Sequence, residues 1–220
     1  MDMKTDNELR RDVEMELRWD PSVVASDIGV AGKNGVITLT GQVSNYYEKW
    51  RAERVAKRVA GVAGLANDIE VRLSTQRTDT DIAQAAALAL KINTTIPPDR
   101  VKVIVEHGWV TLEGNVDWYY QKSSAESAVR HLAGVKAVTN TIAIVPKVIP
   151  ADVRNQIEHA FERNAQIDAR QISIEADDRK VILRGTVRSW AELDEAETAA
   201  WAAPGVSEVD NRLTVRYAVD

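Results

Sequence analysis

One stretch of the chain combines aromatic rings with several cations at helical spacing. Residues 45–61 read NYYEKWRAERVAKRVAG, and apolar residues recur at Ala52, Val55, Ala56 and Val59, which predicts a helix that buries this stripe. The opposite face then carries Tyr47, Trp50, Arg51, Arg54, Lys57 and Arg58. On an anionic membrane the rings would sit at headgroup depth, and each cation would contribute about 1 kcal/mol. We expect this face to bind lipid. The alternative is a solvated face whose cations pair with carboxylates and whose rings cover a neighbouring segment.

A later stretch keeps part of this composition. It contributes Tyr120, Lys122 and Arg130, which we expect to extend the lipid-binding surface. A third related stretch carries Asp194 instead, and we expect no similar anion binding there.

Patterns that would indicate catalysis or metal binding are weak. The chain has no cysteine, and its histidines, His107, His131 and His159, have no second histidine at metal-ligand spacing. One glutamate recurs at matching positions, which we interpret as a solvated or helix-stabilising residue. Its three copies are Glu53, Glu126 and Glu197. We therefore expect no enzyme activity, no metal site and no cofactor.

Composition narrows the function classes further. The net charge is -5, which disfavours a nucleic-acid partner, because phosphate binding needs a basic surface. Apolar residues make up 45% of the chain, but no run reaches the length of a membrane span. The first residues, MDMKTDNELRRDVEMELRW, are charged throughout and unlike a secretory signal, so we expect a cytoplasmic protein.

The elements that position these residues come in three copies. The phrases GVITLTGQV, GWVTLEGNV and RKVILRGTV begin at residues 35, 108 and 179. Around each phrase, apolar residues recur first with helical and then with alternating spacing, and a second helix and strand follow. The sequence thus predicts an α+β fold of three tandem α-β-β-α-β units, over residues 5–73, 80–146 and 151–217. Each unit is expected to be a small three-stranded mixed sheet with two helices packed on one face.

Two glycine positions recur in every unit. The first ends the second strand, at Gly41, Gly114 and Gly185, and we interpret it as allowing a helix to approach that strand. The second follows the second helix, at Gly61, Gly134 and Gly205, and is expected to end it. Aromatic residues also recur in the first turn of the second helix, at Tyr46, Tyr119 and Trp190, which indicates a packing role.

The phrases resemble the BON domain, a family named for bacterial OsmY and nodulation proteins. The resemblance also includes the Ala-Glu pair in the second helix and the asparagine before the last strand, as in VAGVAGLANDIEV. It implies a non-enzymatic module of the osmotic and envelope stress response. It further implies peripheral binding to anionic phospholipid, and a periplasmic location as an alternative to the cytoplasm. A structural or scaffolding protein, whose repeats bind each other or a protein partner, is the rival expectation.

Some apolar residues fall on the faces predicted to point away from the cores. In the second unit they are Ile104, Trp109 and Val145, on the sheet face turned away from the helices. In the third unit Trp201 lies on the outer face of the second helix. Because exposed apolar patches mark interfaces, we expect another repeat or a second chain to cover them.

Overall fold

A computed structural model describes residues 4–73, 77–146 and 152–216. The expected linkers at residues 74–76 and 147–151 lie outside the described residues, as does residue 217 at the end of the third unit. The described part confirms the α+β class, with the same order of elements in each of three repeats.

The elements of the three repeats follow one pattern. The first repeat contains α1 (Asp6–Trp19), β1 (Ile28–Lys33), β2 (Val36–Val43), α2 (Tyr46–Ala56) and β3 (Gly64–Val71). The second contains α3 (Asp79–Ile92), β4 (Val101–Glu106), β5 (Trp109–Val116), α4 (Tyr119–Arg130), β6 (Ala137–Asn140) and β7 (Ala143–Ile144). The third contains α5 (Val153–Arg163), β8 (Ile172–Asp177), β9 (Lys180–Val187), α6 (Trp190–Trp201) and β10 (Glu208–Val215).

Each sheet is mixed, with the middle strand antiparallel to the first strand and parallel to the last. The last strand of the second repeat is split into β6 and β7, which both pair with β5. Both helices of a repeat pack on one face of its sheet, and each repeat buries its own apolar core.

Side chains fix the ends of the helices and the loops near them. Thr5 and Glu8 form the expected capping box at the start of α1, and Thr78 and Asp81 form another at the start of α3. Asn45 also caps α2, but the buried Glu48 carboxylate turns away from the cap and accepts a hydrogen bond from Val24 N at 2.9 Å. Glu48 therefore ties the second helix to the loop that precedes β1.

The glycine that ends each middle strand has a different partner from the expected helix. Gly41 has φ +126°, and a Cβ there would lie 2.0 Å from the carbonyl oxygen of Asp27, just before β1. Gly114 and Gly185 repeat this geometry against Arg100 and Gln171. Only glycine tolerates both the dihedral angle and the close approach. The approach is therefore between neighbouring strands, and the interpretation that a helix settles on this glycine was wrong.

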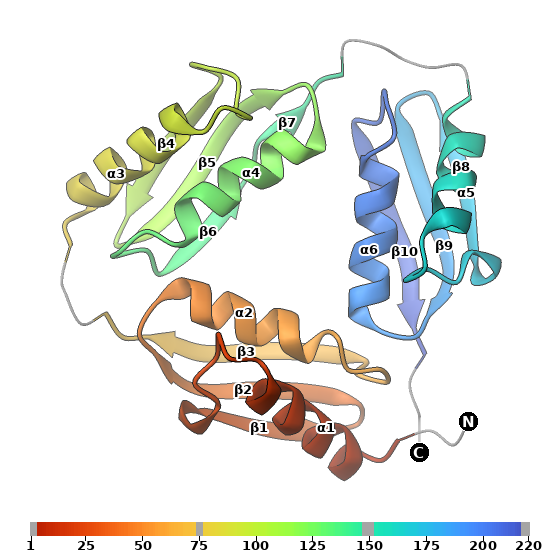
Figure 1. The fold of residues 1–220 in the computed structure, drawn as a ribbon, viewed down its shortest axis with the longest axis horizontal. Coiled ribbons are helices and arrows are strands. Elements are labelled where there is room, and N and C mark those ends of the chain that lie inside the picture. Colours follow the sequence, from red (N-terminus) through yellow and green to blue (C-terminus); the bar gives the residue numbers. More distant parts are fainter. Residues whose placement is uncertain (1–3, 74–76, 147–151, 217–220) are drawn as a thin grey trace.

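The three repeats lie around a common centre. Figure 1 shows α2, α4 and α6 nearest to this centre and the first strand of each sheet at the rim. Backbone hydrogen bonds join the third repeat to the first, from Ala191 N to Lys57 O and from Gly61 N to Arg188 O, at 3.0 and 3.2 Å. The first and last repeats therefore contact each other directly, which closes the arrangement into a ring.

Candidate functional site

The aromatic part of the α2 outer face lies at the contact between the first and second repeats. The Tyr47 ring centroid is 4.2 Å from that of His131. The Arg130 guanidinium carbon lies 3.9 Å from the centroid of the Trp50 ring, in cation–π geometry. Tyr47 and Trp50 also stack on each other at 5.8 Å. Neither ring is exposed, so the second repeat covers this part of the expected lipid surface.

Two cations of the same face reach the third repeat. Arg54 Nη1 donates a hydrogen bond to Asp194 Oδ2 at 2.9 Å. Burial raises the pKa of Asp194, while the charges of Lys57 and Arg54 act in the opposite direction. The Lys57 ammonium pairs with Glu53 at 3.0 Å and lies 5.8 Å from the centroid of the Trp190 ring. Both cations are therefore engaged by carboxylates and by a neighbouring repeat, as the alternative interpretation of this face requires.

The two remaining arginines of α2 bind within their own repeat. Arg51 and Arg58 donate to the buried Asp20 carboxylate at 2.7 and 3.1 Å. Burial raises the pKa of Asp20, but hydrogen bonds from Ser22 and Arg51 outweigh it and lower the pKa to about 2. These arginines thus join the end of α1 to α2. Whether any part of the α2 face also meets lipid stays a prediction.

The contacts between repeats use equivalent positions and run in one direction around the ring. The first-turn aromatic residue of α2, Tyr46, packs against the core of the second repeat. In α4, Tyr119 stacks on Trp201 of the third repeat, with centroids 5.4 Å apart. In α6, Trp190 packs against the core of the first repeat, beside Lys57.

The residues contacted on the next helix are also equivalent. Lys57, Arg130 and Trp201 align when the three middle-strand glycines are superposed in the sequence. Burial raises the pKa of Tyr46, and the Glu126 carboxylate of the second repeat raises it further. Heterologous contacts of this kind form a closed ring when the rotation closes. The recurrence of the first-turn aromatics was visible in the sequence, but their spacing alone did not show that they reach a neighbouring repeat.

The candidates of the second repeat have mixed surroundings. Tyr120 is 55% exposed. Lys122 is half-buried, and burial lowers its pKa. Arg130 is buried and pairs with Glu126 at 2.7 Å, in addition to its contact with Trp50. The structure therefore does not bring these three side chains together into one exposed basic patch.

The repeated glutamate has a specific partner in every repeat. Asn67 Nδ2 donates to Glu53 at 3.2 Å, and Asn140 repeats the contact with Glu126 at 3.3 Å. In the third repeat Asn211 donates to Glu197 at 3.0 Å. The carboxylate therefore links the second helix to the last strand. Two of the most regular features of the sequence thus form one structural pair, and the earlier interpretation of the glutamate as a solvated residue missed it.

The interface candidates fall into two groups. Trp201 packs between the third and second repeats. Ile104, Trp109 and Val145 are 45%, 55% and 47% exposed on the outer sheet face of the second repeat. Another repeat of the same chain therefore does not cover this face, contrary to one of the two expected coverings. Coverage by a second chain stays a prediction.

The first helices of two repeats expose apolar residues that the sequence analysis did not single out. Met15 and Trp19 in α1 are 65% and 84% exposed, and the aligned Leu88 and Ile92 in α3 are 59% and 69% exposed. An exposed cation lies beside each pair, at the aligned positions Arg18 and Lys91. We call these two sets the α1 ridge (Met15, Arg18, Trp19) and the α3 ridge (Leu88, Lys91, Ile92). The signal available in the sequence was the i, i+4 apolar pair opposite the buried stripe of each helix.

The third repeat lacks such a ridge. His159 and Arg163 occupy the aligned positions of α5, and His159 Nδ1 lies 3.2 Å from the carboxylate of Glu162. The apolar exposure is therefore confined, among the three first helices, to α1 and α3.

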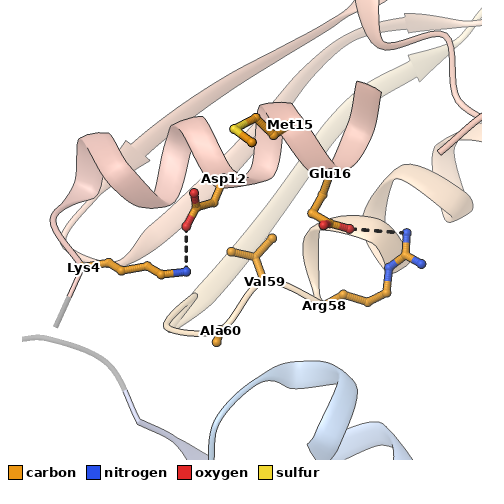
Figure 2. Close-up of a pocket in the computed structure, with 7 residues that line it drawn as sticks. All are labelled: Lys4, Asp12, Met15, Glu16, Arg58, Val59 and Ala60. Carbon is orange, nitrogen blue, oxygen red and sulfur yellow. Dashed lines mark ion pairs between the residues drawn. The ribbon is translucent and has the colours of Figure 1, made fainter. Parts of the chain in front are cut away.

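A groove runs beside the α1 ridge, between α1 and the end of α2, and Figure 2 shows the residues that line it. Its apolar lining includes Met15 and Val59. Lys4 pairs with Asp12 at 2.6 Å, and Arg58 lies 3.9 Å from Glu16. Because these charges are paired with each other, the groove does not have the unpaired cations that a small anion would require.

Membrane-spanning and metal-binding geometry were also considered. Within residues 4–73, 77–146 and 152–216, no helix is both long and apolar enough to cross a bilayer. Over the same residues, no three histidine or carboxylate side chains are grouped to hold a metal ion.

Comparison with known proteins places the chain among known sequences. The BON domain model matches residues 5–72, 78–146 and 151–217. The chain is similar to Osmotically-inducible protein Y of Escherichia coli strain K12, with 29% identity over 143 residues. This alignment covers 62% of the chain and 71% of that protein.

Two solved structures were also found. One is CdsD, a structural protein of the Type III secretion system of Chlamydia trachomatis, with 14% identity and a TM-score of 0.28, covering 94% of this chain and 92% of that one. The other is the PrgH periplasmic domain, with 10% identity and a TM-score of 0.24, covering 94% of this chain and 99% of that one. The family match confirms the resemblance carried by the repeated phrases. Since that model matches three times and accounts for nearly the whole sequence, the chain belongs to the BON domain family.

Proposed function

We propose that this chain is a non-enzymatic protein of the osmotic stress response that binds anionic phospholipid surfaces peripherally. The stress assignment is supported by family membership and by the similarity to a protein named as osmotically inducible. Phospholipid binding is our further proposal, and one observation carries it: the apolar and cationic α1 and α3 ridges.

The composition of the ridges suits the headgroup region of a bilayer. Trp19 is the most exposed large apolar side chain among the described residues, and tryptophan favours the membrane interface. Neither Arg18 nor Lys91 forms an ion pair with another described residue, so both charges are available to lipid phosphates. Each cation would contribute about 1 kcal/mol near an anionic surface.

The ring allows both ridges to contact one surface. Equivalent positions of units related by rotation about an axis lie at the same height along that axis. The α1 and α3 ridges therefore face the same side of the ring. Two weak contacts on one rigid body bind a surface more tightly than either contact alone. This proposal moves the expected lipid surface from α2, where the neighbouring repeats engage the side chains, to the first helices.

Co-sedimentation with vesicles tests the proposal. We expect binding to vesicles rich in phosphatidylglycerol, weaker binding to phosphatidylcholine vesicles, and a loss of binding as salt rises. Trp19→Ala combined with Ile92→Ala should abolish binding, and Arg18→Glu with Lys91→Glu should do the same.

Trp109→Ala is the matched control, because it removes another exposed tryptophan from the sheet face of the second repeat. It should leave vesicle binding unchanged. Equal binding to both lipids, or equal losses in the Trp109 and Trp19 variants, would refute the assignment to the ridges and favour the rival scaffolding function.

The cellular compartment is a separate question. Neither the family match nor the relative supports the cytoplasmic location expected from the first residues. Cytoplasmic and periplasmic locations both stay predictions, and cell fractionation would decide between them.

A further inference from the structure

The first strand of the second repeat is an open edge rich in β-branched residues. β4 reads VKVIVE and lies at the end of the sheet order β4-β5-β6. Its outward side chains, Lys102, Ile104 and Glu106, are exposed, and its inward valines are only half-buried. Regular edges of this kind readily pair with another strand unless charges or bulges prevent it.

The phase of the hydrogen bonds identifies the backbone groups on this open edge. Asn115 N donates to Arg100 O at 3.3 Å, one step outside the Val101–Gly114 pair. Val101 and Gly114 therefore form a non-hydrogen-bonded pair, and Lys102, Ile104 and Glu106 take the hydrogen-bonded positions facing β5. It follows that the N–H and C=O groups of Val103 and Val105 point away from β5. No hydrogen bond from the described residues outside the sheet reaches these groups.

We propose that β4 pairs antiparallel with β4 of a second copy of this chain, about a two-fold axis that passes beside Ile104. In this register Val103 faces Val105 of the second copy, and both residues use the outward backbone groups. Ile104 faces Ile104 of the second copy at the centre.

Charge complementarity fixes this register. Lys102 faces Glu106 of the second copy, and Glu106 faces Lys102 of the second copy, so each dimer contains two opposite-charge pairs. Within one copy, neither side chain forms an ion pair with another described residue. Directly opposed charges of opposite sign stabilise strand pairing, and like charges oppose it. The two sheets become continuous, and their exposed apolar faces, which contain Ile104 and Trp109, join on one side.

The equivalent strands of the other repeats lack this self-complementarity. β1 contains Gly29 and Gly32, which weaken a strand. β8 carries Glu175 at the position aligned with Ile104, and Asp177 at the position aligned with Glu106. Two-fold pairing of β8 in the same register would place Glu175 opposite its own copy. The second repeat is therefore the one that suits a homodimer, and this inference does not depend on lipid binding.

Charge exchange tests both the dimer and its register. The parent protein should sediment as a monomer–dimer equilibrium in a series reaching about 0.1 mM, a range suited to the weak affinities of small interfaces. Lys102→Glu alone and Glu106→Lys alone should each weaken dimerisation by about tenfold or more, because each variant places like charges opposite twice.

An equimolar mixture of the two single variants should restore the dimer, because every facing pair again has opposite charge. Asp177→Lys, on the equivalent strand of the third repeat, should not change the equilibrium. A parent that stays monomeric throughout the series would overturn the proposal. A dimer that both single variants retain, or a mixture that fails to associate, would also overturn it.

Discussion

The contact between Trp50 and Arg130 distinguishes a ring contact from a lipid-binding surface. In Trp50→Ala the chain loses the cation–π interaction, worth about 1–2 kcal/mol for a largely desolvated pair. It also loses the stack with Tyr47, worth about 0.5–1.5 kcal/mol. We therefore expect the free energy of unfolding to fall by about 2–3 kcal/mol. In Arg130→Ala the cation–π interaction is lost together with the ion pair to Glu126.

A double-mutant cycle isolates the shared term. The two single variants and the double variant are unfolded in urea and followed by circular dichroism, which does not depend on the removed tryptophan. We expect a coupling energy of about 1–2 kcal/mol between the two positions, since they contact each other at 3.9 Å.

Trp19→Ala provides the opposite comparison, because Trp19 is 84% exposed. This variant should keep the stability of the parent within about 0.5 kcal/mol while losing vesicle binding. Trp50→Ala should show the reverse. A coupling energy near zero would mean that the first and second repeats do not meet through these side chains in solution. Vesicle binding lost in Trp50→Ala, without loss of stability, would return the lipid surface to α2.

Two further perturbations test local features of the repeats. Gly114→Ala should destabilise the protein by about 4 kcal/mol or more, because the new Cβ would lie 2.0 Å from Arg100 O at a φ of +131°, whereas Gly64→Ala, which has an ordinary φ and meets only a side chain, should be far milder in the same thermal melts. Asp20→Asn should cost about 1–2 kcal/mol at neutral pH; because folding lowers the Asp20 pKa from 3.8 to about 2, this difference should shrink as pH falls through that interval and vanish below it, as measured by urea unfolding at each pH.

The repeated unit could be predicted from the sequence because its signals are local. Alternation around Gly41 and the helical spacing of Leu9, Val13 and Leu17 indicate strands and a helix within a few residues. These apolar residues of α1 are buried in the structure, as their spacing predicts. The partner of Gly41 was harder to predict, because the Asp27 carbonyl belongs to a different strand and leaves no periodic pattern.

The contacts between repeats could not be predicted by the same means. Trp50 lies opposite the buried stripe of α2, and a helical wheel cannot distinguish a neighbouring repeat from solvent or from a membrane. The relevant information is the pairing of two separate positions, such as Tyr119 with Trp201, in consecutive repeats. Periodicity within one repeat contains no such term. Composition alone therefore assigned the α2 face to lipid, although most of its side chains serve contacts within the ring.

Ring closure also explains why chemically different residues occupy equivalent positions. Lys57, Arg130 and Trp201 align, and each lies beside an aromatic ring of the preceding repeat. A cation and an aromatic ring can both pack on a ring face, so this position tolerates either type. The same alignment places Met15 beside Leu88 and Trp19 beside Ile92, yet these residues contact no neighbouring repeat and stay exposed. Apolar exposure that recurs without an internal contact has no role in building the ring, and for this reason we assign it to an external surface.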